Sequence, residues 1–146
     1  MEHFKLGEAC EREGNDADAL RCYRLAADDG YVEAQFKLGT LYHDGQGVPR
    51  NDKAAVGWWR KAADQGYAPA QFSLGYMYKK GTGVPQTYSE ALQWFTLAAR
   101  QGDPDAYLMI GRMYAQGQGV PQNDVEAVRC YRKAVALGHE SSLRTF

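Results

Sequence analysis

The chain has 146 residues, of which 45% are apolar and 12% aromatic, so it is too hydrophobic for a disordered protein and suits a single modest domain. Its formal charge of −1 gives no overall field that would attract nucleic acid or an anionic membrane. No apolar run approaches the roughly 18 to 20 residues of a membrane span, and the first residues do not resemble a secretory signal. We therefore expect a cytoplasmic protein, or a periplasmic or secreted one if a signal peptide has been removed.

The 16 glycines exceed the average share of about 7% and recur at a fixed interval. Gly39, Gly75 and Gly111 lie 36 residues apart, and other glycine series share this period. The stretches 34–69, 70–105 and 106–141 align without a gap, with ten of 36 positions identical in all three. Such a period is typical of a solenoid. We expect one array over residues 1–146, with units at about 1–33, 34–69, 70–105 and 106–141 and a partial capping helix at 140–146.

Each unit is predicted to form two helices joined by a loop, and the first unit has a loop four residues shorter than the others. In the second unit, apolar residues follow a helical spacing from Ala34 to Tyr42, and a second helical stripe runs from Ala55 to Gly66. The third and fourth units repeat both stripes. The expected N-caps of the second helices are Asp52 and Asp124, and the glycines expected to end these helices in a left-handed conformation are Gly66, Gly102 and Gly138.

Gly39, Gly75 and Gly111 fall inside the predicted first helices, where each costs about 1 kcal/mol relative to alanine. Because this loss of helix stability recurs at the same position of three units, we expect a packing contact that compensates for it. We expect the two helices of a unit to approach closely, with the glycines packed against Ala55, Ala91 and Ala127. The Gly-x-Gly-Val-Pro segments between the helices are interpreted as loops rather than dinucleotide-binding turns, because they follow a helix and recur three times.

The second unit carries the full pattern as Ala34, Leu38-Gly39, Tyr42, Gly45, Gly47-Val48-Pro49, Asp52, Ala55, Trp58, Ala62-Ala63 and Gly66. This pattern resembles the Sel-one-like repeat family, relatives of the tetratricopeptide repeats. The third unit departs from it at Tyr88, in place of the aspartate, and the fourth at Cys130, in place of the tryptophan. The resemblance implies an all-α, right-handed α/α superhelical solenoid of about four antiparallel helix pairs, with the first helices on the concave face. It also implies a non-enzymatic protein-binding adaptor or scaffold.

A stacked array makes a long concave surface, which offers a groove for a peptide or helix of a partner protein rather than a closed pocket. The candidate binding residues are Phe36, Thr40, His43, Asp44, Phe72, Tyr76, Lys79, Lys80, Leu108, Arg112 and Gln116, with Phe4, Glu8, Glu11 and Arg12 in the first unit. Their large apolar members either belong to the core, as most such residues do, or form an apolar strip beside Lys79, Lys80 and Arg112. Such a strip would suit a partner segment with an apolar side and some acidic residues.

We expect no catalytic residue, metal site or cofactor. His3, His43 and His139 lie in different units without ligand spacing and are interpreted as solvated surface residues. The three cysteines occupy core positions. Cys10 and Cys22 would be displaced by about 9 Å along an ideal helical hairpin, which is too far for a disulfide.

Two alternative functions come from other classes. Some cysteine-rich relatives in the family are secreted, which would make this chain a periplasmic or secreted ligand-binding or penicillin-recognising envelope protein. Its unpaired cysteines, and the absence of Ser-x-x-Lys and Lys-Thr-Gly elements, argue against that assignment. The other alternative is a self-associating structural element, so that the chain is either a monomer or an end-to-end dimer.

Overall fold

A computed structural model describes the backbone of residues 2–145 and the side chains of residues 2–138. Residues 2–145 form eight α-helices and no strand, as the sequence predicted for an all-α array. The helices are α1 (Glu2–Arg12), α2 (Asp16–Asp28), α3 (Val32–Asp44), α4 (Asp52–Asp64), α5 (Ala68–Lys80), α6 (Tyr88–Arg100), α7 (Pro104–Gln116) and α8 (Asp124–Thr145). From α3 onward, each first helix begins two residues before the unit boundary drawn from the sequence.

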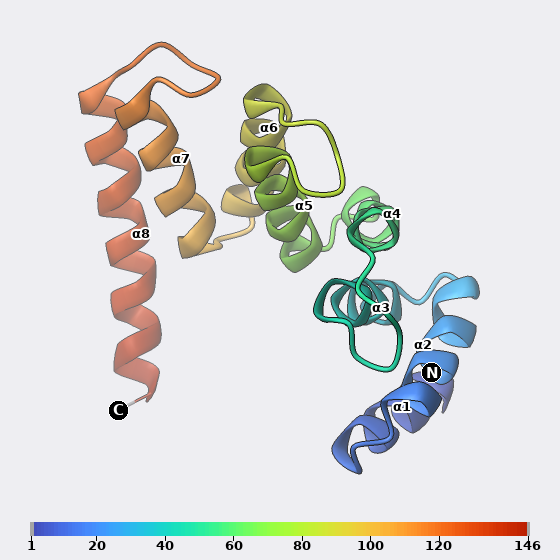
Figure 1. Ribbon diagram of the computed structural model, residues 1–146. Coiled ribbons are helices and arrows are strands. Elements are labelled where there is room, and N and C mark those ends of the chain that lie inside the picture. The colour runs from blue at the N-terminus through green and yellow to red at the C-terminus, as the bar shows by residue number, and fades with distance from the viewer. Residues whose placement is uncertain (1, 146) are drawn as a thin grey trace.

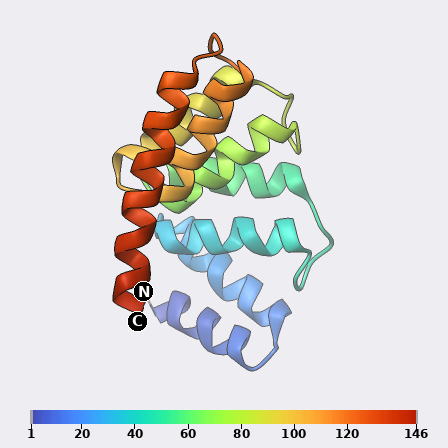
Figure 2. The ribbon, with the colours of Figure 1, turned by 90° about the vertical axis from the view of Figure 1, so that its left-hand side faces the viewer.

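The helices form antiparallel pairs that stack along a curve, with α1 and α2 at one end and α7 and α8 at the other (Figure 1). Figure 2 shows the pairs as successive layers. Each helix packs chiefly on its neighbours in sequence, so α2 contacts α3, α4 contacts α5 and α6 contacts α7. The buried side chains form three clusters, each joining the second helix of one unit to the first helix of the next. This is the superhelical repeat fold that the 36-residue period predicts.

Within the described residues, none of the helices combines the length and hydrophobicity that crossing a bilayer requires.

The glycines inside the first helices leave room for an aromatic ring on the second helix of the same unit. A β-carbon at Gly75 would lie 2.9 Å from two carbons of the Phe95 ring and 3.3 Å from the carbonyl oxygen of Ala91. The same relationship pairs Gly7 with Tyr23, Gly39 with Trp59, and Gly111 with Tyr131. The predicted close approach is therefore confirmed, and the expected alanines take part in it at Gly75 and Gly111, through the carbonyl oxygens of Ala91 and Ala127 at 3.3 and 3.2 Å. At Gly39 the nearest atoms belong to Trp59 and not to Ala55. The sequence did not predict the aromatic ring, which needs the volume that the missing side chain leaves.

The loops between paired helices also contact the preceding unit. Gly83 has a φ of +75°, and a β-carbon there would lie 2.7 Å from the carbonyl oxygen of Asp52, at the start of α4. Gly47 and Gly119 lie in the same way against Asp16 and Tyr88. A side chain at this loop position would push the two units apart, so the second glycine of Gly-x-Gly serves the contact between units.

The second helices begin one residue earlier than the expected caps imply. The N-cap of α4 is Asn51, whose Oδ1 accepts a hydrogen bond of 3.1 Å from the backbone N–H of Ala54. Asn123 plays the same role at α8. The prediction of Asp52 and Asp124 as N-caps was therefore wrong by one residue. The asparagine side chain reaches the free N–H groups of the first turn, and the following aspartate favours the positive end of the helix dipole.

Glycines end the second helices of the first three units. Gly66 and Gly102 have φ values of +89° and +95°, which confirms their predicted left-handed conformation, and Gly30 has a φ of +88°. Gly138 contradicts the prediction, because α8 continues through it to Thr145. Glycine adopts helical and left-handed backbone about equally, so the packing of a following helix, not the glycine alone, ends these helices. Residues 140–145, where the sequence predicted a partial capping helix, continue α8, whereas residue 146 and the side chain of His139 lie outside the described residues.

Buried glutamines connect successive units. Gln71 is 4% exposed and donates through Nε2 to the carbonyl oxygen of Ala63, at 3.3 Å, in the preceding unit. Its Oε1 accepts a hydrogen bond of 2.9 Å from Gln101. Gln35 makes the equivalent bonds with Ala27 and Gln65. Because both ends of each buried amide are bonded, these side chains join the units without an unpaired polar group.

Candidate protein-binding groove

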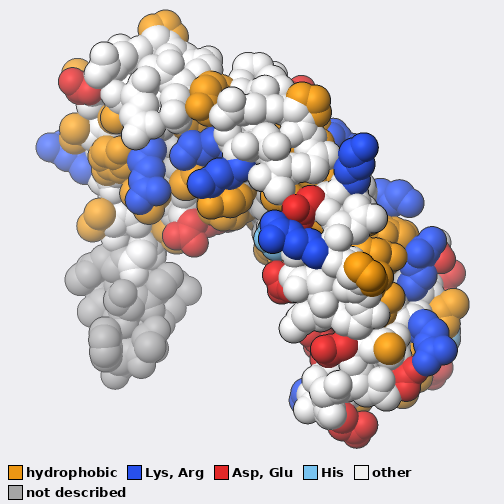
Figure 3. Space-filling view, in the orientation of Figure 1, with side chains coloured by type: hydrophobic (Ala, Val, Ile, Leu, Met, Phe, Trp, Pro, Cys, Tyr) orange, Lys and Arg blue, Asp and Glu red, His pale blue; other side chains and the backbone are white. Residues whose placement is uncertain are grey.

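The candidate residues lie on helices at the inner side of the curve. Figure 1 shows α3, α5 and α7 on the inner side and α4, α6 and α8 on the outer side. In Figure 3, Lys and Arg side chains flank hydrophobic ones along the inner edge formed by α5 and its neighbours. The first helices therefore line the concave face, as the family resemblance implied.

Three helices from two units surround a hollow of about 300 Å³ on this face. Its lining residues are Thr40 and His43 from α3, Trp59 from α4, and Phe72, Ser73, Tyr76 and Met77 from α5. The sequence had placed Thr40, His43, Phe72 and Tyr76 among the candidates, and the fold brings these four together. It had missed the other three. The signal for Trp59 was its position opposite Gly39, since a glycine inside a helix leaves space for a ring.

Three of the large apolar candidates are half-buried, and the fourth belongs to the core. Phe72 is half-buried, with its ring centroid 5.4 Å from that of Phe95. Phe36 is also half-buried, between Trp59 and Tyr67 at centroid distances of 6.4 and 5.5 Å. Leu108 is half-buried in α7, whereas Phe4 belongs to the core. Phe72 therefore both lines the hollow and packs on the buried Phe95, so the two interpretations apply together to that residue.

His43 is part of a polar network rather than a solvated residue. Its Nδ1 donates to Oδ1 of Asp52 at 2.8 Å, and its ring centroid lies 5.5 Å from that of Trp59. Arg50 binds the other carboxylate oxygen of Asp52 at 3.1 Å. Burial acts to raise the pKa of Asp52, but the hydrogen bonds from His43 and Arg50 outweigh it, so the pKa lies below its ordinary value. The network holds the imidazole at the edge of the hollow.

The basic candidates gather where α5 faces α7. Lys79 is half-buried, and its pKa is lowered by burial and then by the positive charges of Arg112 and Lys80. The ammonium group of Lys80 lies 5.5 Å from the ring centroid of Tyr76, which lines the hollow. The remaining candidates, Asp44 and Gln116, are exposed at the last positions of α3 and α7, outside the lining of the hollow.

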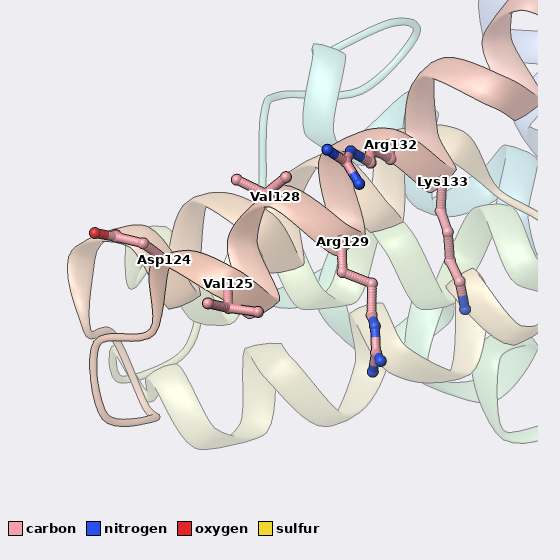
Figure 4. A pocket seen from close by; sticks show the side chains of 6 residues that line it. All are labelled: Asp124, Val125, Val128, Arg129, Arg132 and Lys133. Carbon is pink, nitrogen blue, oxygen red and sulfur yellow. The ribbon is translucent and has the colours of Figure 1, made fainter.

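A larger hollow, of about 650 Å³, runs along α8 and was not predicted from the sequence. Asp124, Val125, Val128, Arg129, Arg132 and Lys133 line it, all from one helix. Figure 4 shows Val128 and Arg132 on one side of the helix, with Arg129 and Lys133 on the other. Side chains that diverge around a single helix cannot converge on a ligand, so the inner hollow is the better candidate site.

Among the described residues, no group of three or more His, Cys, Asp or Glu side chains could hold a metal ion. Cys10, Cys22 and Cys130 are free thiols. Burial and then the neighbouring Cys22 thiol raise the pKa of Cys10.

Solved structures with similar folds come from several bacteria. A Sel1 repeat protein from Oxalobacter formigenes is 35% identical to this chain with a TM-score of 0.87, over 93% of this chain and 57% of that one. A protective antigen of uropathogenic Escherichia coli with an SLR fold is 38% identical with a TM-score of 0.88, over 93% and 30% of the two chains. Helicobacter pylori cysteine rich protein B is 25% identical with a TM-score of 0.62, over 87% and 96%.

One curated relative matches a shorter stretch. An exopolysaccharide production negative regulator from Rhizobium leguminosarum bv. viciae is 35% identical over 49 residues, which are 34% of this chain and 18% of that protein. The chain thus spans only part of the Oxalobacter, Escherichia and Rhizobium proteins. The Sel1 repeat family model matches residues 3–31, 32–67, 68–103 and 104–139, nearly the whole array of helix pairs. With its glycine–aromatic pairs and Gly-x-Gly loops in every full unit, the chain belongs to the Sel1 repeat family.

Proposed function

We propose that this Sel1 repeat protein is a non-catalytic scaffold that binds a peptide or helix of a partner protein in its concave groove. Sel1-repeat solenoids are typically protein-interaction folds. The observation that carries the proposal is the hollow between α3, α4 and α5, which has an aromatic floor at Trp59 and Phe72 and polar groups at His43 and Tyr76. Grooves of this composition suit an apolar side chain flanked by hydrogen-bonding groups.

The distribution of sequence variation among the units supports the same role. Positions that pack the units together repeat, as Gly39, Gly75 and Gly111 do. Several positions on the inner face differ from unit to unit. Thr40, Tyr76 and Arg112 occupy equivalent positions in three units, and so do His43, Lys79 and Ala115. A binding surface requires this combination, because the repeated residues hold the scaffold while the different ones distinguish partners.

The open shape of the groove favours binding over catalysis. A hollow open along the concave face admits water, and acid–base and nucleophilic chemistry gain from sites that exclude it. The name of the Rhizobium relative, a negative regulator, fits a scaffold that acts through other proteins.

The proposal can be tested with peptides that are selected from a phage-displayed library for binding to the intact chain. Their affinity for the Tyr76→Ala variant should be at least about tenfold lower than for the unchanged protein, since truncation of a contacting tyrosine commonly costs that much. Leu97→Ala is the matched control, because Leu97 is 39% exposed on the outer helix α6. Thermal melting of both variants shows whether the fold is retained. Peptides that bind Tyr76→Ala and the unchanged protein equally would contradict the proposed groove.

A further inference from the structure

The hollow between α3 and α5 has a counterpart at the α1–α3 junction, and its residues have sequence equivalents at the α5–α7 junction. Because the repeat is 36 residues long, His43 corresponds to Lys79 at the α5–α7 junction, and Tyr76 corresponds to Arg112. At the α1–α3 junction, a hollow of about 330 Å³ is lined by Glu8, Glu11, Arg12 and Lys37. The groove therefore contains three successive sets of equivalent residues with different side chains, one at each junction between units.

The α5–α7 position carries an excess of positive charge. Among the described residues, Lys79, Lys80 and Arg112 form no ion pair with an acidic side chain. Burial and the two neighbouring cations lower the pKa of Lys79. Like charges held close together are unfavourable, and a bound anion would relieve both the repulsion and the partial desolvation.

The α1–α3 position has no such excess, because its two acidic and two basic side chains balance. Glu11 accepts a hydrogen bond from the hydroxyl of Tyr23, and its carboxylate lies 3.8 Å from Nζ of Lys37. The middle position is lined by aromatic, hydroxyl and thioether side chains together with His43. The character of the groove thus changes along its length. The α1–α3 position has balanced charges, the middle position is mainly apolar, and the α5–α7 position is basic.

We propose that the groove recognises a partner segment in which an apolar side chain fills the hollow beside Trp59 and Phe72, while neighbouring carboxylates bind Lys79 and Arg112. This inference rests on the proposed scaffold function and adds the chemistry of the partner. The two positions adjoin, because Lys80 lies against the Tyr76 ring that borders the hollow. One continuous segment can therefore occupy both, and the charge asymmetry fixes which end of it lies at α7.

Synthetic fluorescein-labelled peptides provide the test. In a Gly/Ser background, each carries one Leu or Phe, followed at increasing spacing by two Glu. Matched sets carry Gln or Lys in place of Glu, and binding to the intact chain is measured by fluorescence anisotropy at low salt. At the best spacing, the Glu peptide should bind at least about tenfold more tightly than the Gln peptide, and added salt should reduce this advantage.

The Lys79→Glu/Arg112→Glu variant should lose the preference for Glu and acquire one for Lys. Its matched control is Lys53→Glu/Arg100→Glu, which makes the same change in net charge at exposed positions of the outer helices α4 and α6. The control should retain the preference. If charge reversal disturbs folding, Lys79→Met/Arg112→Leu should abolish the preference while leaving binding of the Gln peptide unchanged.

The outcomes separate this inference from the scaffold function. Equal binding of Glu and Gln peptides, with both weakened by Tyr76→Ala, would overturn the carboxylate preference and leave the groove in place. Peptide binding that is insensitive both to charge reversal and to Tyr76→Ala would overturn both. A phosphoserine peptide that binds where the Glu peptide does not would overturn the assignment to carboxylates.

Discussion

Trp59 lies against Gly39 across the α3–α4 pair, with two ring atoms 2.5 Å from the point where a β-carbon of residue 39 would stand. Its Nε1 donates a hydrogen bond of 3.2 Å to the carbonyl oxygen of Phe36. The same ring borders the inner hollow. The glycine that holds the helix pair together therefore also positions an aromatic side chain on the surface proposed to bind partners.

Gly75→Ala should lower the free energy of unfolding by about 1–3 kcal/mol, measured by urea denaturation. The added β-carbon would meet the Phe95 ring, which is fully buried, and this overpacking outweighs a gain in helix propensity of about 1 kcal/mol. Gly75→Leu should unfold the repeat. Gly57→Ala is the control, because no atom lies within 4 Å of a β-carbon at Gly57 in α4, so it should stabilise the protein. Equal effects at the two glycines would refute the packing argument.

Gly83→Ala should destabilise the protein more than Gly66→Ala does. Both glycines have a left-handed backbone, with φ values of +75° and +89°, so each substitution introduces strain of about 1–2 kcal/mol. Only Gly83 also lies against the backbone of Asp52, whereas a β-carbon at Gly66 meets open space. Thermal melting of the two variants measures the difference, and a larger loss for Gly66→Ala would show that the loop does not hold the units together.

Gln71→Leu should cost about 1–3 kcal/mol, because it removes two hydrogen bonds of a buried amide, one to the carbonyl oxygen of Ala63 and one from Gln101. Gly66 still donates to that carbonyl oxygen, and Gln101 still donates to the carbonyl oxygen of Gly66. Gln101→Ala should cost less, because Gln101 is exposed and water can replace its bonds. Urea unfolding should also become broader in Gln71→Leu, since the second and third units lose a direct connection. A transition as sharp as that of the unchanged protein would argue against this connecting role.

Asp52→Asn should lower stability by about 0.5–1 kcal/mol near neutral pH, because it weakens the ion pair with Arg50. The folded-state pKa of Asp52 is lowered, so its contribution is present above the unfolded pKa of about 3.9 and is lost as the pH falls through the folded value. The stabilities of variant and unchanged protein should therefore converge as the pH falls below the lowered folded-state pKa of Asp52. Urea denaturation measured from neutral to acidic pH checks this expectation, with Asp44→Asn as a control. A stability difference between Asp52→Asn and the unchanged protein that does not depend on pH would show that the charge of the Asp52 carboxylate is not its cause.

Much of the inner face could be predicted because helical periodicity assigns each residue to a side of its helix. Thr40, His43, Phe72 and Tyr76 were identified in this way, and the fold gathers them around one hollow. Trp59 was missed as a lining residue because it lies on a second helix, whose apolar stripe indicates only core. The contact of His43 with Asp52 was missed as well, because it spans a loop whose path the period does not specify.

The 36-residue period by itself determined the helix pairs, their order and the solenoid class, since glycine, proline and apolar residues act mainly through local backbone preference and helical spacing. The composition also showed an excess of glycine, but it did not show which contacts require those glycines. Only the tertiary structure decided that Gly39, Gly75 and Gly111 face an aromatic ring inside their unit, and that Gly47, Gly83 and Gly119 face the backbone of the preceding unit. It also decided that Gly138 lies within a helix, because such choices depend on the packing of neighbouring segments and not on the residue alone.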